Sequence, residues 1–185
     1  VRQSDMQNWM MDLDRFLLDC NSFTELADHL HTWLDQHGCG SLNLLMNPDI
    51  FRLEQIDTLL NIPDDTYLSI GYPDQMAIVY PYIDSTETTL DLSSGTLIPH
   101  IKDSGKQNFY LFSPVHFRER EIGYLILENC DYLLDHQFLF ETLNTFRTAI
   151  EALYGKLLMR KKNKQLSQLY IHDSLTGLYN RMAYE

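Results

Sequence analysis

The apolar residues of this chain change their spacing twice, and this change limits the folds that the chain can adopt. Near the N-terminus they recur at three- and four-residue steps, which predicts helices over residues 4–18 and 22–37. Ser22 and Glu25 have the spacing of a capping box, and Gly38 is placed to end the second helix. Strand-like segments follow, and a helical period then returns. This order predicts an α+β fold, an antiparallel sheet with its helices gathered on one face.

The middle of the chain carries the predicted strands. Residues 41–46 form one, and residues 109–117 and 121–128 form a pair of apolar strands in the core of the sheet. A short helix is expected between residues 48 and 60, and a hairpin joins 66–72 to 75–80 at Pro73-Asp74. Residues 81–108 have no regular pattern, and two interpretations stay open: a lid over a binding site, or a surface connection.

From residue 135 onward the apolar residues follow alternating four- and three-residue steps. We predict that this seam is a dimer interface, pairing with the same residues of a second copy in a parallel coiled coil. The register fails at Arg160 and Lys164 and resumes, shifted, at Leu166 and Leu169, as in a stutter. The predicted interface residues are Leu139, Leu143, Phe146, Ile150, Leu153 and Leu157.

Charge and composition exclude several classes of function. A formal net charge of −12 disfavours nucleic-acid binding, since a phosphate backbone would be repelled. No apolar run is long enough to cross a membrane, so we expect no membrane segment in this chain and a cytoplasmic location. Cys20, Cys39 and Cys130 are widely spaced, and we expect reduced thiols and no metal site.

The sequence gives weaker indications of a ligand site. Aromatic and polar side chains in and after the predicted strands are candidates to line a small-molecule pocket, although ordinary core and surface roles explain them better. These candidates are Tyr80, Tyr82, Tyr110, Phe112 and His116. The sequence does not identify the ligand, and no catalytic motif for phosphate or acyl transfer occurs.

The segment Asp173 to Arg181 has the sequence D-S-L-T-G-L-Y-N-R. It closely resembles the D-x-L-T-G-L-x-N-R opening of GGDEF domains, the diguanylate cyclases that join two GTP molecules into cyclic di-GMP. The resemblance implies that Asp173, Asn180 and Arg181 belong to the hinge between a helical stalk and the catalytic domain. The catalytic residues of that family lie beyond this opening, so we expect no complete active site here and no cofactor in this part. Mg²⁺ and GTP are expected for the catalytic domain that would follow.

The earlier part of the chain resembles a GAF sensor domain. The resemblance rests on the order of elements, on Ser113-Pro114-Val115, and on Ile122-Gly123-Tyr124-Leu125. A PAS domain is the main alternative, but it usually places its helices between strands. We therefore divide the chain into an N-terminal helix (1–20), a GAF-like sensor (21–134), a coiled-coil signalling helix (135–172) and the start of a GGDEF domain (173–185).

These resemblances imply a function. The chain is expected to be the sensor and dimerisation module of a bacterial diguanylate cyclase, a homodimer that acts on its GGDEF domain through the stalk. The alternative is a ligand-free dimerisation or protein-interaction module of a degenerate GGDEF signalling protein. A cavity under the 81–108 segment would favour the first.

Overall fold

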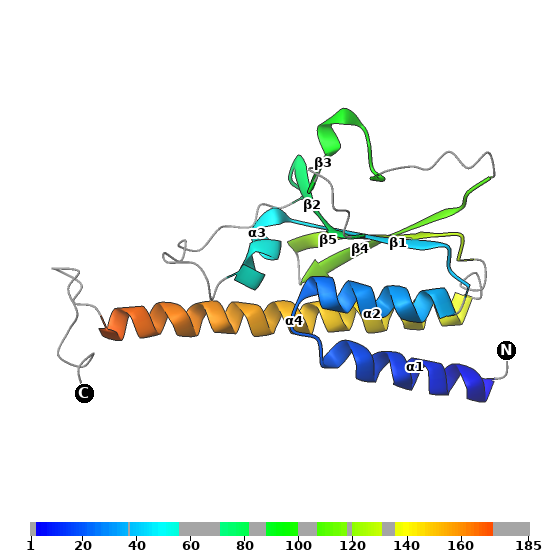
Figure 1. The fold of residues 1–185 in the computed structure, drawn as a ribbon, viewed down its shortest axis with the longest axis horizontal. Coiled ribbons are helices and arrows are strands. Elements are labelled where there is room, and N and C mark those ends of the chain that lie inside the picture. The colour runs from blue at the N-terminus through cyan, green and yellow to red at the C-terminus, as the bar shows by residue number, and fades with distance from the viewer. Residues whose placement is uncertain are drawn as a thin grey trace.

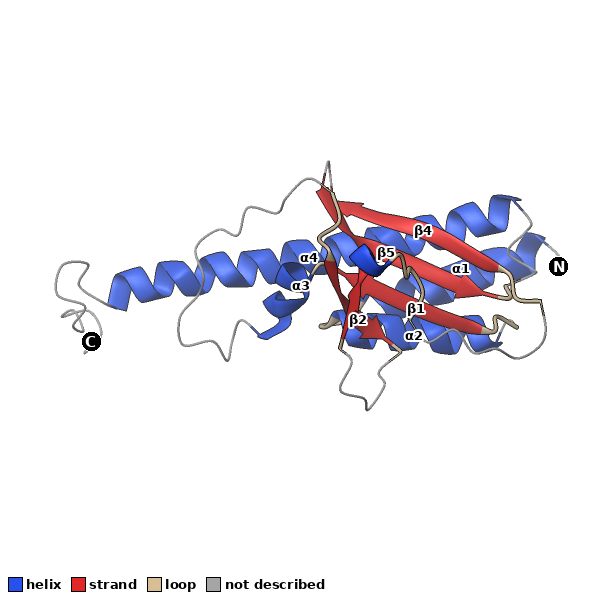
Figure 2. Cartoon of the chain, turned by 90° about the horizontal axis from the view of Figure 1, so that it is seen from above, coloured by secondary structure: helices blue, strands red, loops and turns tan. Residues whose placement is uncertain are grey.

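The computed structural model has the predicted α+β architecture, with a five-stranded antiparallel sheet and its long helices on one face (Figures 1 and 2). It describes residues 3–36, 38–55, 71–81, 88–99, 107–117, 120–130 and 136–171. The helices are α1 (Gln3–Leu18), α2 (Phe23–Gln36), α3 (Pro48–Phe51) and α4 (His136–Ile171), with 3-10 turns η1 (Arg52–Gln55) and η2 (Leu92–Ser94). The strands are β1 (Ser41–Met46), β2 (Gln75–Tyr80), β3 (Thr89–Asp91), β4 (Tyr110–Phe117) and β5 (Arg120–Glu128).

Helix α2 begins and ends where its sequence predicts. The Ser22 hydroxyl accepts a hydrogen bond from the Glu25 backbone N–H at 3.0 Å, and the Glu25 carboxylate accepts one from the Asn21 N–H at 2.8 Å. Glu54 of η1 also accepts a hydrogen bond from the Phe23 N–H. Gly38 lies just past the helix with a φ of 81°, which a residue with a side chain rarely adopts. The Ser22 cap and the C-terminal glycine are therefore confirmed, whereas the Glu25 carboxylate bonds the N–H of Asn21 instead of the Ser22 N–H that a capping box uses.

The strands lie in the order β3-β2-β1-β5-β4. Strand β2 pairs with β1 on one edge and with β3 on the other. The first arm of the hairpin predicted between 66–72 and 75–80 lies mostly outside the described residues, and residues 71–72 form no strand. The partner β3, Thr89–Asp91, lies in the segment without a regular pattern. Residues 56–70 are outside the described part of the chain, so the helix predicted over 48–60 is confirmed only as α3 and η1.

Strands β1 and β5 approach each other closely at Gly123. A Cβ atom at this position would lie 2.1 Å from the carbonyl oxygen of Leu45 and 2.9 Å from the Cα of Met46. Only glycine fits this spacing without moving the backbone. The Ile122-Gly123 pair therefore allows the two central strands to come together.

The main core lies between the sheet and the helices. Alternate residues of β1 point into it (Leu42, Leu44 and Met46), where they meet Leu13 and Leu17 of α1 and buried side chains of α2 and α4. Helix α1 is thus part of the same core rather than a separate unit. None of the described helices is both long and apolar enough to span a membrane.

Candidate functional site

A cavity of about 210 Å³ lies on the outer face of the sheet, opposite the helices. This is the face that the β3–η2 segment covers in Figure 1. Its walls come from Tyr72, three positions before β2, from η2 and a residue that follows it, and from β4 and β5. The lining residues are Tyr72, Leu92, Leu97, Phe112, Pro114 and Tyr124.

Strand alternation explains why these side chains meet. Phe112 and Pro114 of β4 point outward on the same face as Tyr124 of β5, because Pro114 and Tyr124 are paired in the sheet. The rings of Phe112 and Tyr124 lie 6.4 Å apart, and the ring of Tyr72 meets Tyr124 edge to face at 5.6 Å. The cavity is thus walled by aromatic rings, with aliphatic side chains from the η2 segment.

Two tyrosine hydroxyls tie the cavity walls together. The Tyr124 hydroxyl donates a hydrogen bond to the Leu97 carbonyl at 3.0 Å, which joins β5 to the segment after η2. The Tyr72 hydroxyl donates to the Gly123 carbonyl at 3.2 Å. Burial, and then the neighbouring Tyr72, raises the pKa of Tyr124 to about 12. Both hydroxyls are therefore neutral donors near pH 7, and each already has a protein acceptor.

The Glu121 carboxylate holds the backbone next to Tyr72 in place. The Gly71 backbone N–H donates to a Glu121 carboxylate oxygen at 2.8 Å, and this hydrogen bond lowers the pKa of Glu121. The chain before β2 is thus anchored to the start of β5. This anchoring places Tyr72 over the sheet before any ligand binds.

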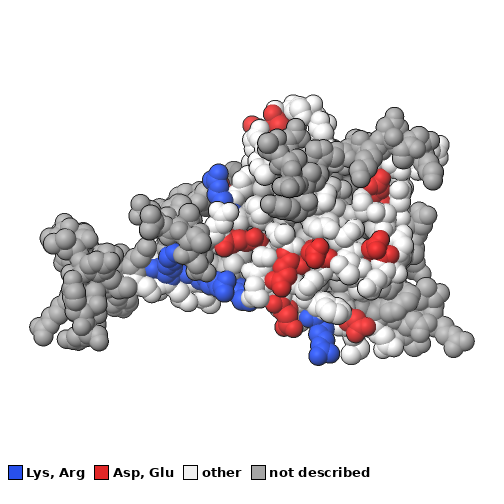
Figure 3. All heavy atoms as spheres, viewed as in Figure 1, with Lys and Arg blue, Asp and Glu red and all other residues white. Residues whose placement is uncertain are grey.

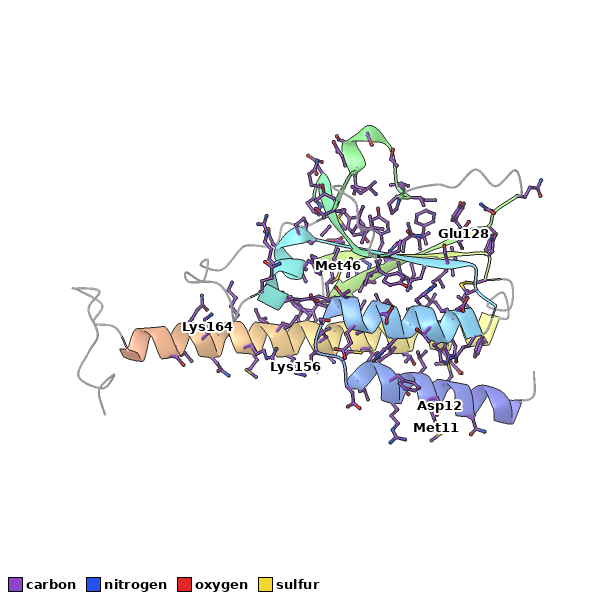
Figure 4. The ribbon with its side chains drawn as sticks, viewed as in Figure 1. Met11, Asp12, Met46, Glu128, Lys156 and Lys164 are labelled. Atoms are coloured by element: carbon purple, nitrogen blue, oxygen red, sulfur yellow. A yellow bond between two sulfur atoms is a disulfide. The ribbon has the colours of Figure 1, made fainter. Side chains whose placement is uncertain are left out.

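The same face of the sheet carries a polar side chain, Glu128, farther along the strands than the cavity. Glu128 of β5 accepts hydrogen bonds from the Ser41 hydroxyl at 2.6 Å and, more weakly, from the Tyr110 hydroxyl at 3.4 Å. Figure 4 shows Glu128 at the end of the sheet, beyond Met46 along the strands. The cavity thus has an aromatic floor and a polar, acidic group farther along one face.

Asn43 lies between the aromatic floor and the polar group. It is paired across the sheet with Ile126, which is paired in turn with Phe112. Asn43 is only 7% exposed and is not among the residues that line the cavity. The lining of the cavity is therefore apolar apart from the two tyrosine hydroxyls, which already have protein acceptors.

The predicted pocket residues separate into two groups. Phe112 lines the cavity, and Tyr110 lies on the same face, bound to Glu128. Tyr80 is directed instead to the helices, with its ring 5.2 Å from that of His31, and His116 is paired with Glu121 beyond a bulge. The pocket prediction is therefore wrong for Tyr80 and His116, and Tyr82 lies outside the described residues.

Reasoning from the sequence missed most of the cavity. Pro114 and Tyr124 were noted for their resemblance to a family and not as pocket residues. Their outward direction follows from the alternation of β4 and β5, which the sequence does show. Tyr72, Leu92 and Leu97 carry no such signal, because no regular strand or long helix sets their direction.

Helix α4 places the predicted dimer seam inside the protomer. Phe146, Ile150, Leu153 and Leu157 are at most 4% exposed and pack against the sheet and the other helices, while Leu139 and Leu143 are half-buried beside them. Tyr154 also contacts Phe117 of β4, ring to ring, at 4.9 Å. The four buried side chains are not available to a second copy while this core is intact.

The opposite face of α4 carries a second stripe at alternating four- and three-residue steps. Met159 is 63% exposed and Leu166 52% exposed, and a Cβ added at Gly155 would meet nothing within 4 Å. Leu166, whose register appeared shifted in the sequence, belongs to this outer stripe rather than to a stutter of the inner one. The outer stripe consists of Thr148, Ala152, Gly155, Met159, Lys162 and Leu166.

The end of α4 extends past the sheet (Figures 1 and 2). Figure 3 shows Lys and Arg side chains along this protruding part, while Asp and Glu lie over the body of the domain. Lys164, labelled in Figure 4, belongs to this part of α4, and Lys156 lies nearer the body. The helix thus leaves an acidic domain as a basic stalk.

We expect Tyr124→Phe to destabilise the chain by about 1 kcal/mol, since it removes one hydrogen bond from the cavity wall. In the wild type, folding raises the pKa of Tyr124. The stability that its neutral hydroxyl contributes is therefore complete below pH 10 and is lost as the pH rises toward about 12. Urea unfolding at pH 7 and at pH 11 measures both effects. Between pH 7 and pH 11 the variant should lose less free energy of unfolding than the wild type. Equal losses would contradict the raised pKa of Tyr124.

The predicted hinge residues Asp173, Asn180 and Arg181 lie outside the described part of the chain. Among the residues that are described, no three His, Cys, Asp or Glu side chains gather in a way that would hold a metal ion. Comparison of the chain with protein-family models, curated proteins and solved structures finds no match.

Proposed function

We propose that this chain is the sensor and dimerisation part of a diguanylate cyclase, which acts in the cytoplasm and makes cyclic di-GMP from GTP. The main support for the proposal is the length and direction of helix α4. It is one helix of 36 residues that runs from the core to Ile171, two residues before the segment that resembles a GGDEF opening. A change in the sheet can therefore be passed along one rigid element to that segment.

The sensor is proposed to be GAF-like. Its long helices precede and follow the strands, and the two motifs of the resemblance lie in β4 and β5. The signal is proposed to be a small molecule with an aromatic or aliphatic body. The aromatic and aliphatic side chains that line the cavity support this chemistry. The volume of about 210 Å³ favours a ligand smaller than a typical drug.

The cavity also favours a sensor over the alternative, a ligand-free interaction module. A domain used only for dimerisation gains nothing from an aromatic cavity on the outer face of its sheet. A ligand regulates such a dimer only if it binds one arrangement of α4 more tightly than another. The rings of Phe117 in β4 and Tyr154 in α4 are in contact, so a shift of the sheet would act directly on the helix.

The homodimer is proposed to form through the outer stripe of α4, with the two helices parallel. The small residues Ala152 and Gly155 allow close approach beside the domain, and Met159 and Leu166 supply apolar contact along the stalk. A short helix that protrudes alone into water is only marginally stable, so a partner helix would stabilise it. Parallel pairing would place two GGDEF domains together, as the joining of two GTP molecules requires.

The proposed function is tested on the natural protein that contains this chain together with the region that follows it. The protein is incubated with GTP and Mg²⁺, and the product is identified by mass spectrometry. We expect cyclic di-GMP, at a rate that changes when the sensor is occupied. A folded, dimeric protein that forms no cyclic di-GMP would contradict the proposal and favour a degenerate GGDEF protein.

A further inference from the structure

Two cysteines that are far apart in the sequence meet at one end of the sheet. Cys39 precedes β1 and Cys130 follows β5, 91 positions later, and the structure joins them in a disulfide with their Cα atoms 4.3 Å apart. The expectation of reduced thiols is therefore wrong for this pair. The strand register brings the two cysteines together. Ser41 is paired with Glu128, so the residues just outside the two strands must also be close.

The surrounding backbone fixes this juxtaposition without help from the sulfur atoms. The Gly40 N–H donates a hydrogen bond to the Glu128 carbonyl at 2.9 Å, and the Cys39 N–H donates to the Leu34 carbonyl at 3.0 Å. A Cβ at position 40 would lie 3.0 Å from the Glu128 carbonyl oxygen, so a side chain there would require the backbone to shift slightly where the two chains cross. Because hydrogen bonds hold the two positions together, the fold is expected to persist when the disulfide is open.

We propose that Cys39 and Cys130 are a reversible redox site, whose disulfide is opened by a dithiol and closed by a low-molecular-weight disulfide. On opening, the two cysteines gain two electrons and two protons and the dithiol becomes a cyclic disulfide. On closing, two thiol protons and two electrons pass to the small disulfide, which leaves as two thiols. The inference rests on the proposed cytoplasmic function, because disulfides in cytosolic proteins are usually transient, catalytic or redox-sensing.

The third cysteine is not part of this chemistry. Cys20 lies between α1 and α2, where its thiol contacts the Phe16 carbonyl and the His29 ring. Burial, and then Glu25 and Asp19, raise the pKa of Cys20 to about 11, so it stays a thiol and is a poor nucleophile near pH 7. Cys39 and Cys130 are as deeply buried as Cys20, but they are joined to each other, so Cys20 has no thiol partner and serves as an internal control.

The bond lies where it can affect the output helix. Helix α4 begins six positions after Cys130, and the disulfide ties Cys130 to Cys39, which follows the end of α2. The first turns of α4 already contact α2 through the rings of Phe138 and Trp33, 6.1 Å apart. Opening the disulfide removes the covalent part of this attachment and leaves only the packing contacts. The redox state would thus set how firmly the start of α4 is held.

The test equilibrates the whole chain in mixtures of reduced and oxidised dithiothreitol and traps free thiols by alkylation, with peptide mass spectrometry to locate them. We expect Cys39 and Cys130 to become free together, with circular dichroism unchanged, and oxidised glutathione to restore the bond. Hydrogen exchange in the first two turns of α4 should become at least about tenfold faster on reduction. Cys20→Ser should show the same transition.

Cys130→Ser should lack the transition and exchange at the rate of the reduced chain. The proposal is overturned if reduction unfolds the chain, if both thiols stay free in excess oxidised glutathione, or if α4 exchanges equally fast in both states. None of these measurements involves GTP. A failure here is therefore distinct from a failure to form cyclic di-GMP.

Discussion

Ile150→Glu is expected to unfold the chain rather than to separate two folded copies. Ile150 is fully buried in the core, between the sheet and the helices. A carboxylate at this position loses its hydration, which costs at least about 4 kcal/mol and is a large part of the stability of a domain this size. Urea unfolding followed by circular dichroism measures the loss.

Phe140→Glu is the matched control, since Phe140 lies on the same helix but is 65% exposed. Its unfolding midpoint should correspond to a change of no more than about 0.5 kcal/mol. The opposite result for Ile150→Glu, a folded monomer with the wild-type midpoint, would show that the inner face of α4 is a dimer seam after all.

Met159→Lys is expected to weaken the dimer about a hundredfold while leaving each copy folded. Met159 is 63% exposed in the single chain, and in the proposed dimer it meets its own copy, so the variant loses apolar contact twice and sets two like charges together. Sedimentation equilibrium over a range of protein concentrations measures the dissociation constant.

Phe140→Lys serves as the control for this prediction too, because Phe140 is as exposed as Met159 but lies off the outer stripe. It should leave the dissociation constant unchanged. Equal weakening by both variants would indicate a general effect of charge, and a dimer unaffected by Met159→Lys would place the interface elsewhere.

The sequence predicted the helices and strands better than it predicted which of their faces are buried. The period of the apolar residues was enough for α1, α2 and α4, and the pairing of β4 with β5 was expected because both strands are apolar and adjacent. It did not reveal which side of α4 faces inward. Over three turns, a heptad seam and the inner face of an amphipathic helix have nearly the same period, so Phe146 and Ile150 fit both descriptions.

The cavity and the cysteine pair depended on contacts between distant segments. Strand β3 is only three residues long, too short for an alternating pattern, and without it the positions of Leu92 and Leu97 over the sheet are not predictable. Cys39 and Cys130 have no close spacing in the sequence, and their proximity depends on the β1–β5 register, so the sequence predicts only reduced thiols. Tertiary structure, rather than local preference, determines these features.

The parallel pairing of α4 is the central claim about this chain, and cross-linking at Gly155 tests it most directly. In a parallel, in-register pair Gly155 faces its own copy, so Gly155→Cys in a Cys20→Ser background should form a covalent dimer under mild oxidation. Lys156→Cys, one residue off the stripe, should not. Cross-linking of Gly155→Cys alone is the predicted result. Equal cross-linking of both variants, or none in a chain that is dimeric in solution, would contradict the account.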